Sequence, residues 1–170
     1  MAVRRVCVVG NIASGKSRFT DRVVAALGLP SYSLDQLWWL PGWANVGRDE
    51  FLARQLEIVG REQWVIDGTY AEVGLAERFR AADAIVFMDV PGCARRAIAR
   101  RGDGRTDLPD GVDDTELGLG LALAIFAELV FFNVLKRPRI LAEARRCGKP
   151  FHRVRRWSDQ DGVLAALAAT

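Results

Sequence analysis

The stretch Val3 to Ser17 restricts the possible folds of this chain more than any other. It reads VRRVCVVGNIASGKS, an apolar β-branched run that breaks off into Gly10-x-x-x-x-Gly15-Lys16-Ser17. This is the P-loop pattern, in which a strand ends in a glycine-rich loop that opens a helix. Because glycine has no Cβ, the backbone at Gly10 and Gly15 can turn sharply and bring N–H groups close to an anion. The alternative is a chance glycine-rich turn between a strand and a helix.

The polar residues of the pattern have predicted roles in holding a nucleotide. Lys16 would reach the β- and γ-phosphates and act in catalysis, and the Ser17 hydroxyl would bind Mg²⁺. The free N–H groups and the positive dipole end of the following helix face the same anion. ATP and Mg²⁺ are therefore the expected cofactors. The candidate nucleotide-binding residues are Gly10, Asn11, Ala13, Ser14, Gly15, Lys16, Ser17 and Arg18.

Length and composition favour one P-loop domain over residues 1–170. The net charge of +3 and the pI near 9.0 come from arginines clustered in 95–105 and 137–156, which indicates local anion sites more than a nucleic-acid face. Three cysteines with no C-x-x-C pair indicate neither a disulfide framework nor a zinc site, and they fit a reducing cytoplasm. No signal peptide is expected.

Apolar runs alternate with helical patterns along the chain, which predicts a doubly wound α/β sheet. The run 117–135 only just reaches the length of a membrane span and contains Glu128 and Asn133, so we expect a buried amphipathic helix and no membrane association. After the P-loop strand, strands are expected at 31–34, 64–66, 84–88 and 151–154, the last at a sheet edge. Helices are expected from the P-loop to Leu27 and over 48–60, 71–79, 93–101, 115–135 and 138–148, with Ser158 capping a final helix.

Three aspartates follow predicted strands and so lie on the same sheet edge as the P-loop. Asp67 follows an apolar strand as a Walker-B acid does, and it is a candidate Mg²⁺ ligand. Asp35 is a candidate for orienting or deprotonating an acceptor hydroxyl, and hence for catalysis and substrate binding. Asp89 precedes Val-Pro, and capping of the next turn is its simpler interpretation.

Two further groups are candidates for binding the reactants. Trp38, Trp39 and Trp43 lie beside Asp35 and could stack on a substrate, and the alternative is that they form the small core of a loop. Arg96 and Arg100 are four residues apart and share a helix face next to a breaker-rich segment, 102–114. Guanidinium groups suit the charge that develops in phosphoryl transfer, so both are catalytic candidates, with a solvated basic face as the alternative.

Taken together, GNIASGKS, LDQLWWLPGWANV followed by RDEF, WVIDGTY and IVFMDVP resemble the topology modulation proteins, a branch of P-loop kinases related to adenylate kinase. The resemblance covers most of 3–105. It implies a five-stranded parallel sheet of the nucleoside-monophosphate-kinase type, a mobile acceptor-binding segment at about 35–61 and a lid at about 102–114. It also implies that Asp67 sits near Mg²⁺ and that Arg96 and Arg100 match the paired arginines that enter the lid.

One departure from this resemblance leaves the acceptor open. Adenylate kinases continue Asp-Gly with Phe-Pro-Arg, whereas this chain has Asp67-Gly68-Thr69-Tyr70 and lacks the arginine that would hold the acceptor phosphate. We therefore expect an ATP- and Mg²⁺-dependent phosphotransferase acting on a small molecule. The alternative is an ATP-binding regulatory or DNA-associated protein without kinase turnover, which the basic pI would suit.

Overall fold

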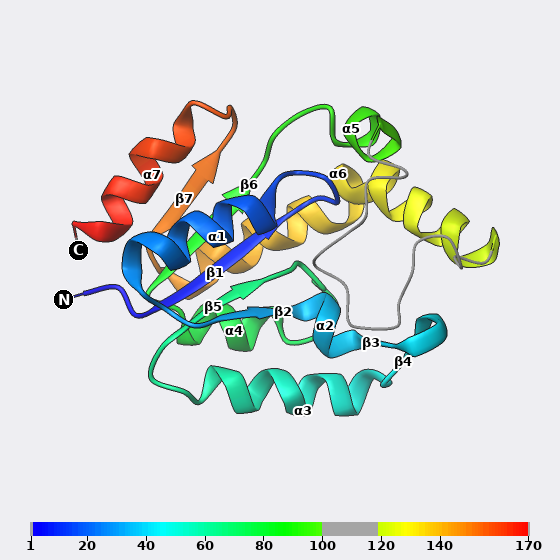
Figure 1. Cartoon of the computed structure of the whole chain (residues 1–170), viewed down its shortest axis with the longest axis horizontal. Helices are drawn as coiled ribbons and strands as arrows, with labels where there is room; N and C mark the ends of the chain where they lie inside the picture. The colour runs from blue at the N-terminus through cyan, green and yellow to red at the C-terminus, as the bar shows by residue number, and fades with distance from the viewer. Residues whose placement is uncertain (1, 100–118, 170) are drawn as a thin grey trace.

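A five-stranded parallel sheet forms the centre of the molecule, as predicted (Figure 1). The computed structural model describes residues 2–99 and 119–169. The sheet has the order β2-β5-β1-β6-β7, so the P-loop strand is central and the last strand lies at an edge. The strands are β1 (Arg5–Gly10), β2 (Ser31–Ser33), β5 (Trp64–Asp67), β6 (Ala84–Met88) and β7 (Phe151–Val154).

Alternation along the strands creates two apolar layers, one on each face of the sheet. Val6 and Val8 of β1 pack with α1 (Lys16–Leu27) and α7 (Asp159–Ala168). Cys7 and Val9 face the opposite layer, which is formed by α3 (Arg48–Val59), α4 (Leu75–Ala81) and α6 (Leu119–Cys147). Since both faces are covered, the three central strands β1, β5 and β6 are apolar almost throughout, as a parallel sheet requires.

The long helix α6 corrects two expectations. The sequence predicted a break before Pro138, but one helix of 29 residues runs through that proline. Proline removes only one backbone hydrogen bond, and burial of Phe132 and Ile140 on either side of it holds the helix against the sheet.

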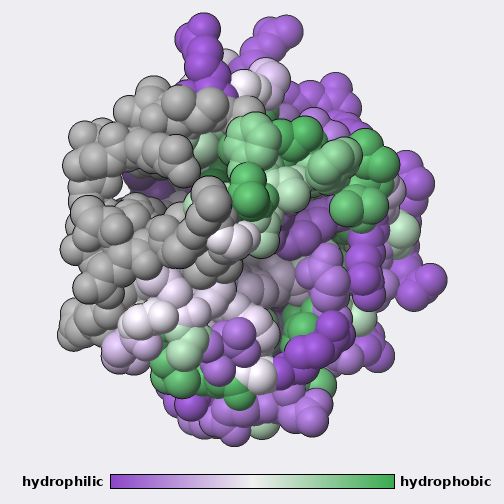
Figure 2. Space-filling view, turned by 90° about the vertical axis from the view of Figure 1, so that its right-hand side faces the viewer, coloured by the Kyte–Doolittle hydropathy of each residue, from purple (hydrophilic) through white to green (hydrophobic). Residues whose placement is uncertain are grey.

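The part of α6 that precedes Pro138 is also more exposed than the predicted buried helix. Its exposed apolar side chains contribute to the apolar surface visible in Figure 2, and Val134 is 70% exposed. The set comprises Leu123, Phe126, Val130, Phe131, Val134 and Leu135. No helix in the described parts of the chain combines the length and apolar character needed to cross a bilayer.

Local differences appear at other boundaries. The aromatic stretch, where the sequence predicted neither a helix nor a strand, contains four short elements. They are α2 (Leu34–Trp38), β3 (Trp39–Leu40), the 3₁₀ turn η1 (Pro41–Trp43) and β4 (Ala44–Asn45), with β3 and β4 paired antiparallel. The helix expected over 71–79 is α4, which begins at Leu75. The basic helix α5 spans Cys93–Ala99.

The carboxyl end of α1 matches the sequence prediction, whereas the amino end of α7 is capped differently from the prediction. Helix α1 ends at Leu27 as predicted, and the Gly28 N–H donates to the Val24 carbonyl at 2.8 Å. At α7, the Ser158 side chain makes no capping hydrogen bond. The Asp159 carboxylate instead accepts from the backbone N–H groups of Arg155 and Arg156, both at 2.9 Å, because the chain turns back over it.

Candidate active site

Three neighbouring strands bring the P-loop and two aspartates to one edge of the sheet. In the strand register, Asp67 of β5 lies beside Val8 of β1 on one side and Ser33 of β2 on the other. Gly10 ends β1, and Asp35 follows two residues after Ser33. The predicted common edge is therefore present, with the P-loop, Asp67 and Asp35 contributed by adjacent strands.

The P-loop has no room for side chains at its two motif glycines. A Cβ on Gly10 would lie 2.7 Å from the Met88 carbonyl oxygen. Gly15 has a φ of 83°, and a Cβ there would lie 2.5 Å from the Trp157 ring. Helix α1 starts directly after Gly15, so the N–H groups of its first turn have no intrahelical acceptor and are available to an anion. The Lys16 ammonium donates to the Asn11 carbonyl at 3.2 Å, which places it within the loop.

The turn after β5 is bonded directly to the P-loop strand. The Gly68 N–H donates to the Val8 carbonyl at 3.1 Å. The Thr69 hydroxyl accepts from the Gly10 N–H at 3.0 Å and donates to the Gly10 carbonyl at 2.6 Å. Asp67, only 7% exposed, is thereby held next to the start of the loop.

The donors near the P-loop fit Mg²⁺ in their chemistry. The Ser17 hydroxyl and the Asp67 carboxylate offer hard oxygen atoms, which Mg²⁺ prefers. Over residues 2–99 and 119–169, no group of three or more His, Cys, Asp or Glu side chains could hold a metal ion. A magnesium ion here would therefore need phosphate and water oxygens as well, which is usual in nucleotide sites.

Asp35 is linked to the same turn through Tyr70. The Tyr70 hydroxyl donates to Asp35 Oδ1 at 2.7 Å. Its ring packs against Phe51 and Trp38, with ring centroids 4.9 Å and 6.0 Å away. Rings on two helices, α2 and α3, thus fix the position of the Tyr70 hydroxyl that holds this carboxylate.

The three tryptophans pack mainly on one another and on neighbouring rings. Trp38 lies 5.0 Å from Phe51 and 6.1 Å from Trp39, measured between ring centroids. Trp39 in turn lies 5.1 Å from Trp43, which is 9% exposed. The three rings therefore form a packed aromatic cluster next to Asp35.

Arg96 lies against the P-loop itself. Its Nε donates to the Ala13 carbonyl at 3.0 Å and its Nη1 to the Pro91 carbonyl at 2.7 Å. The guanidinium also lies over the Trp157 ring, 5.4 Å from its centroid. The second predicted arginine, Arg100, and the predicted lid at 102–114 lie outside the described residues.

Asp89 has a different role from the predicted turn cap. Its carboxylate forms ion pairs with Arg137 of α6, at 3.0 Å, and with Arg153 of β7. Both arginines come from parts of the chain that are remote in sequence. A cap is inferred from local sequence alone, so this long-range pairing could not have been anticipated from it.

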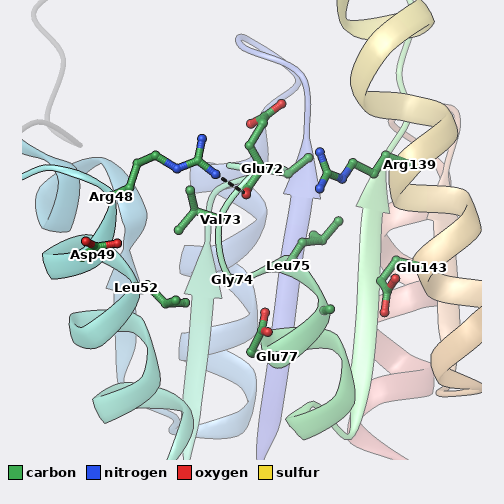
Figure 3. A pocket seen from close by; sticks show the side chains of 12 residues that line it. Arg48, Asp49, Leu52, Glu72, Val73, Gly74, Leu75, Glu77, Arg139 and Glu143 are labelled. Carbon is green, nitrogen blue, oxygen red and sulfur yellow. Dashed lines mark hydrogen bonds between the residues drawn. The ribbon is translucent and has the colours of Figure 1, made fainter.

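A pocket of about 380 Å³ lies beside this edge, between α3, the turn before α4, and α6 (Figure 3). Arg48 and Arg139 lie on opposite sides of the pocket, and both side chains point toward Glu72. An Arg48 Nη2 group donates to the Glu72 carbonyl at 3.1 Å. The pocket adjoins the segment that carries Tyr70.

Sequence reasoning missed several residues that organise the site. Thr69 and Tyr70 directly follow Asp67-Gly68, and that adjacency was a usable signal. Arg78 lies between Leu75 and Phe79 on the buried side of α4, where an arginine is unexpected. Trp157 carried no sequence signal, because its contact with Gly15 depends on how β7 and α7 are joined.

This chain is similar to known proteins in its structure. No family model matches the chain, and no curated protein matches it in sequence. A shikimate kinase from Acinetobacter baumannii in complex with shikimate has a TM-score of 0.61 and 14% identity, covering 98% of this chain and 92% of that one. A presumed kinase from Chloroflexus aurantiacus has a TM-score of 0.56 and 14% identity, covering 98% of each chain. Together with the sheet order and the P-loop, these likenesses show that the chain has the α/β fold of the P-loop kinases.

Proposed function

We propose that the protein is an ATP- and Mg²⁺-dependent phosphotransferase that moves the γ-phosphoryl group of ATP to a small-molecule acceptor. The observation that carries this proposal is the placement of a P-loop and two carboxylates, Asp67 and Asp35, at the ends of three adjacent strands on one sheet edge. One carboxylate is bonded through its turn to the P-loop, and the other lies on the side of the aromatic segment. This separation suits a donor side and an acceptor side.

The donor side would act by holding phosphate oxygens in place. Lys16 and the N–H groups of the loop and of the first turn of α1 bind the β- and γ-phosphates. Ser17 and Asp67 would hold Mg²⁺, which when bound neutralises charge on the β- and γ-oxygens. Arg96 braces the loop through the Ala13 carbonyl and supplies a positive charge beside it.

The acceptor side would act through Asp35, within the segment at about 35–61. The Tyr70 hydroxyl fixes the carboxylate, so Asp35 can orient an acceptor hydroxyl and take its proton as that oxygen attacks the γ-phosphorus. Trp38, Trp39 and Trp43 would shape the entry to this side. Phosphoryl transfer needs positioning and charge more than covalent work by the protein, so this arrangement is sufficient.

The alternative, a regulatory or DNA-associated protein, receives less support from the arginines. Arg96 is engaged with the P-loop, and Arg137 and Arg153 are engaged with Asp89. These three arginines are therefore explained by contacts at the sheet edge. We also propose a cytoplasmic setting, in line with the three free thiols of Cys7, Cys93 and Cys147. We propose further that the chain forms a single domain.

The test is a screen for acceptor-dependent release of ADP from ATP and Mg²⁺. The panel should contain small hydroxy acids, shikimate included because a structural neighbour holds it, together with sugars, nucleosides and nucleoside monophosphates. We expect at least one compound to raise ADP release well above the rate with water, and Lys16→Ala to abolish that increase. A flat panel, combined with salt-sensitive DNA binding that ATP modulates, would favour the alternative.

A further inference from the structure

A fully buried arginine lies directly behind the candidate active site. Arg78 of α4 is 0% exposed, and its guanidinium donates to four backbone carbonyls. Over the described residues it forms no ion pair with a carboxylate, so backbone carbonyls are the direct partners of its charge. Burial lowers the pKa of Arg78 to about 10, with nearby Cys7 and Glu77 opposing that shift, so the group is charged at neutral pH.

Three of these carbonyls belong to consecutive residues of the turn after β5. Nη1 donates to Gly68 at 3.1 Å, and Nη2 donates to Thr69 at 2.6 Å and to Tyr70 at 3.4 Å. Nε donates to the Gly74 carbonyl at 3.1 Å, which closes the far end of the same segment. One planar group therefore sets the path of the chain from Gly68 to Gly74.

Each of the three consecutive residues contacts a different part of the site. Gly68 directly follows Asp67 and is bonded to Val8 of the P-loop strand. The Thr69 hydroxyl is bonded to the N–H and the carbonyl of Gly10. The Tyr70 hydroxyl is bonded to Asp35, so a shift of this turn would move the metal side and the acceptor side together.

The turn also has a backbone conformation that needs external support. Tyr70 has a φ of 34°, which is unfavourable for a residue with a Cβ. Such conformations are energetically costly and persist only when surrounding contacts enforce them. The two bonds from Nη2, to the carbonyls of Thr69 and Tyr70, supply that enforcement at the strained residue.

We propose that Arg78 is a positioning residue of the active site, whose buried guanidinium fixes the turn that places Asp67 against the P-loop and Tyr70 against Asp35. This inference rests on the proposed function, because it assigns the turn a role in Mg²⁺-dependent nucleotide binding. Lysine cannot replace the arginine. Its single nitrogen donates from one point and cannot span carbonyls that the planar fork reaches from three nitrogens.

The test compares Arg78→Lys with Arg80→Lys, a matched control two residues along the same helix whose side chain is 64% exposed. Calorimetry gives the Kd of ATP with Mg²⁺ and with EDTA for each protein. We expect Arg78→Lys to keep the affinity measured in EDTA and to lose roughly tenfold of the strengthening by Mg²⁺, as is typical when the support of a metal ligand is removed. Arg80→Lys should match the wild type in both conditions.

A second measurement examines the nucleotide-free protein. Hydrogen–deuterium exchange over residues 66–74 should be faster in Arg78→Lys than in the wild type and unchanged in Arg80→Lys. If Arg78→Lys does not fold, Arg78→Gln carries the test, because its neutral amide places no unpaired charge in the core and donates from one nitrogen only, so it cannot span the carbonyls of the turn. A loss of the Mg²⁺ effect in folded Arg78→Gln supports the inference, and wild-type binding overturns it.

The outcomes also separate this inference from the function on which it rests. A wild-type protein that binds no ATP in either condition contradicts both. A wild type with Mg²⁺-strengthened binding, matched in full by folded Arg78→Lys, overturns the positioning role alone. A variant that only melts at a lower temperature, with its Mg²⁺ effect intact, likewise shows that Arg78 is structural.

Discussion

At the scale of single residues, the two carboxylates of the candidate site lie in different surroundings. Asp67 is nearly buried, in a turn bonded to Val8 and Gly10, whereas Asp35 is partly exposed and held by the Tyr70 hydroxyl. A buried carboxylate beside phosphates suits a fixed charge. A more accessible carboxylate suits contact with an acceptor that enters and leaves.

Lys16 gives the first prediction. Lys16→Ala should weaken ATP binding by roughly 10- to 100-fold, since a charged hydrogen bond contributes about 1.5–3 kcal/mol. The fold should survive, because the ammonium donates to a loop carbonyl and does not belong to either apolar layer. Calorimetry and a thermal melt measure the two effects. A folded variant with wild-type ATP affinity would contradict the assigned role of the P-loop.

The second prediction separates the acceptor side from the donor side. Asp35→Asn should lower kcat by roughly 10²-fold or more, the usual contribution of an acid–base group, and leave the Kd of ATP unchanged. Tyr70→Phe should lower kcat less, because it removes only the hydroxyl that fixes the carboxylate. Steady-state rates with the acceptor from the screen, set beside calorimetric ATP affinities, check both. If ATP affinity falls in step with kcat in both variants, these residues serve the nucleotide and not the acceptor.

At the scale of elements, α6 shows that a long helix can continue through a proline when both of its flanks are buried. Phe132 and Ile140 belong to the same apolar layer, on either side of Pro138. The local sequence favours a break here, since proline lacks an N–H and crowds the preceding turn. Packing against the sheet outweighs that local preference.

The third prediction follows from this continuity. Pro138→Ala should raise the melting temperature by roughly 3–10 °C, because proline in a helix interior is about 3 kcal/mol less favourable than alanine and each kcal/mol shifts Tm by roughly 2–4 °C at this size. Restored freedom of the unfolded chain offsets part of the gain. Differential scanning calorimetry measures the shift. A lower Tm would mean that the packing of α6 requires the bend that proline imposes.

At the scale of the whole molecule, a stabilising ion pair and the candidate site lie at opposite ends of the sheet. Asp83 precedes β6, at the end where β1 begins. Its carboxylate accepts from the backbone N–H groups of Arg4 and Arg5 at 3.0 and 2.9 Å, and it forms an ion pair with the Arg5 side chain at 3.0 Å. These bonds join the start of two central strands far from the P-loop.

The fourth prediction uses the pKa of Asp83. Burial raises this pKa, but the Arg5 side chain and the two backbone N–H groups outweigh burial and hold it below its ordinary value of 3.8. The folded state is therefore stabilised above about pH 3.8, and that stabilisation is lost as the pH falls through the lowered pKa. Asp83→Asn should melt roughly 3–6 °C below the wild type at pH 7, from about 1.5 kcal/mol for a charge-assisted bond.

The same comparison at low pH provides the check on the cause. The difference in Tm between Asp83→Asn and the wild type should shrink below pH 3.8, and ATP affinity at pH 7 should be the same in both proteins. A difference in Tm that is constant from pH 7 to pH 3 would show that the carboxylate charge is not responsible.

The fold was largely predictable because its signals are local. Apolar runs such as 84–88 specify buried parallel strands, and the P-loop fixes one strand, one loop and one helix in order. The shared edge of Asp35 and Asp67 then follows from the topology. The resemblance to the topology modulation proteins remains a prediction at that level of detail.

The rest of the site depends on long-range contacts that no local pattern encodes. Arg78 contradicts the rule that buried helix positions are apolar, and only the path of the turn after β5 explains it. The pairing of Asp89 with Arg137 and the contact of Trp157 with Gly15 join segments far apart in the chain.

The central claim is that this chain transfers the γ-phosphoryl group of ATP to a small molecule, and ³¹P NMR tests it most directly. The spectrum of ATP and Mg²⁺ is followed with the wild-type protein and the acceptor panel, and in parallel with Lys16→Ala. The account predicts that ADP resonances grow together with a new phosphoester or phosphoanhydride resonance, and that neither grows with Lys16→Ala. Growth of inorganic phosphate alone, an unchanged ATP spectrum, or the same product from Lys16→Ala would contradict it.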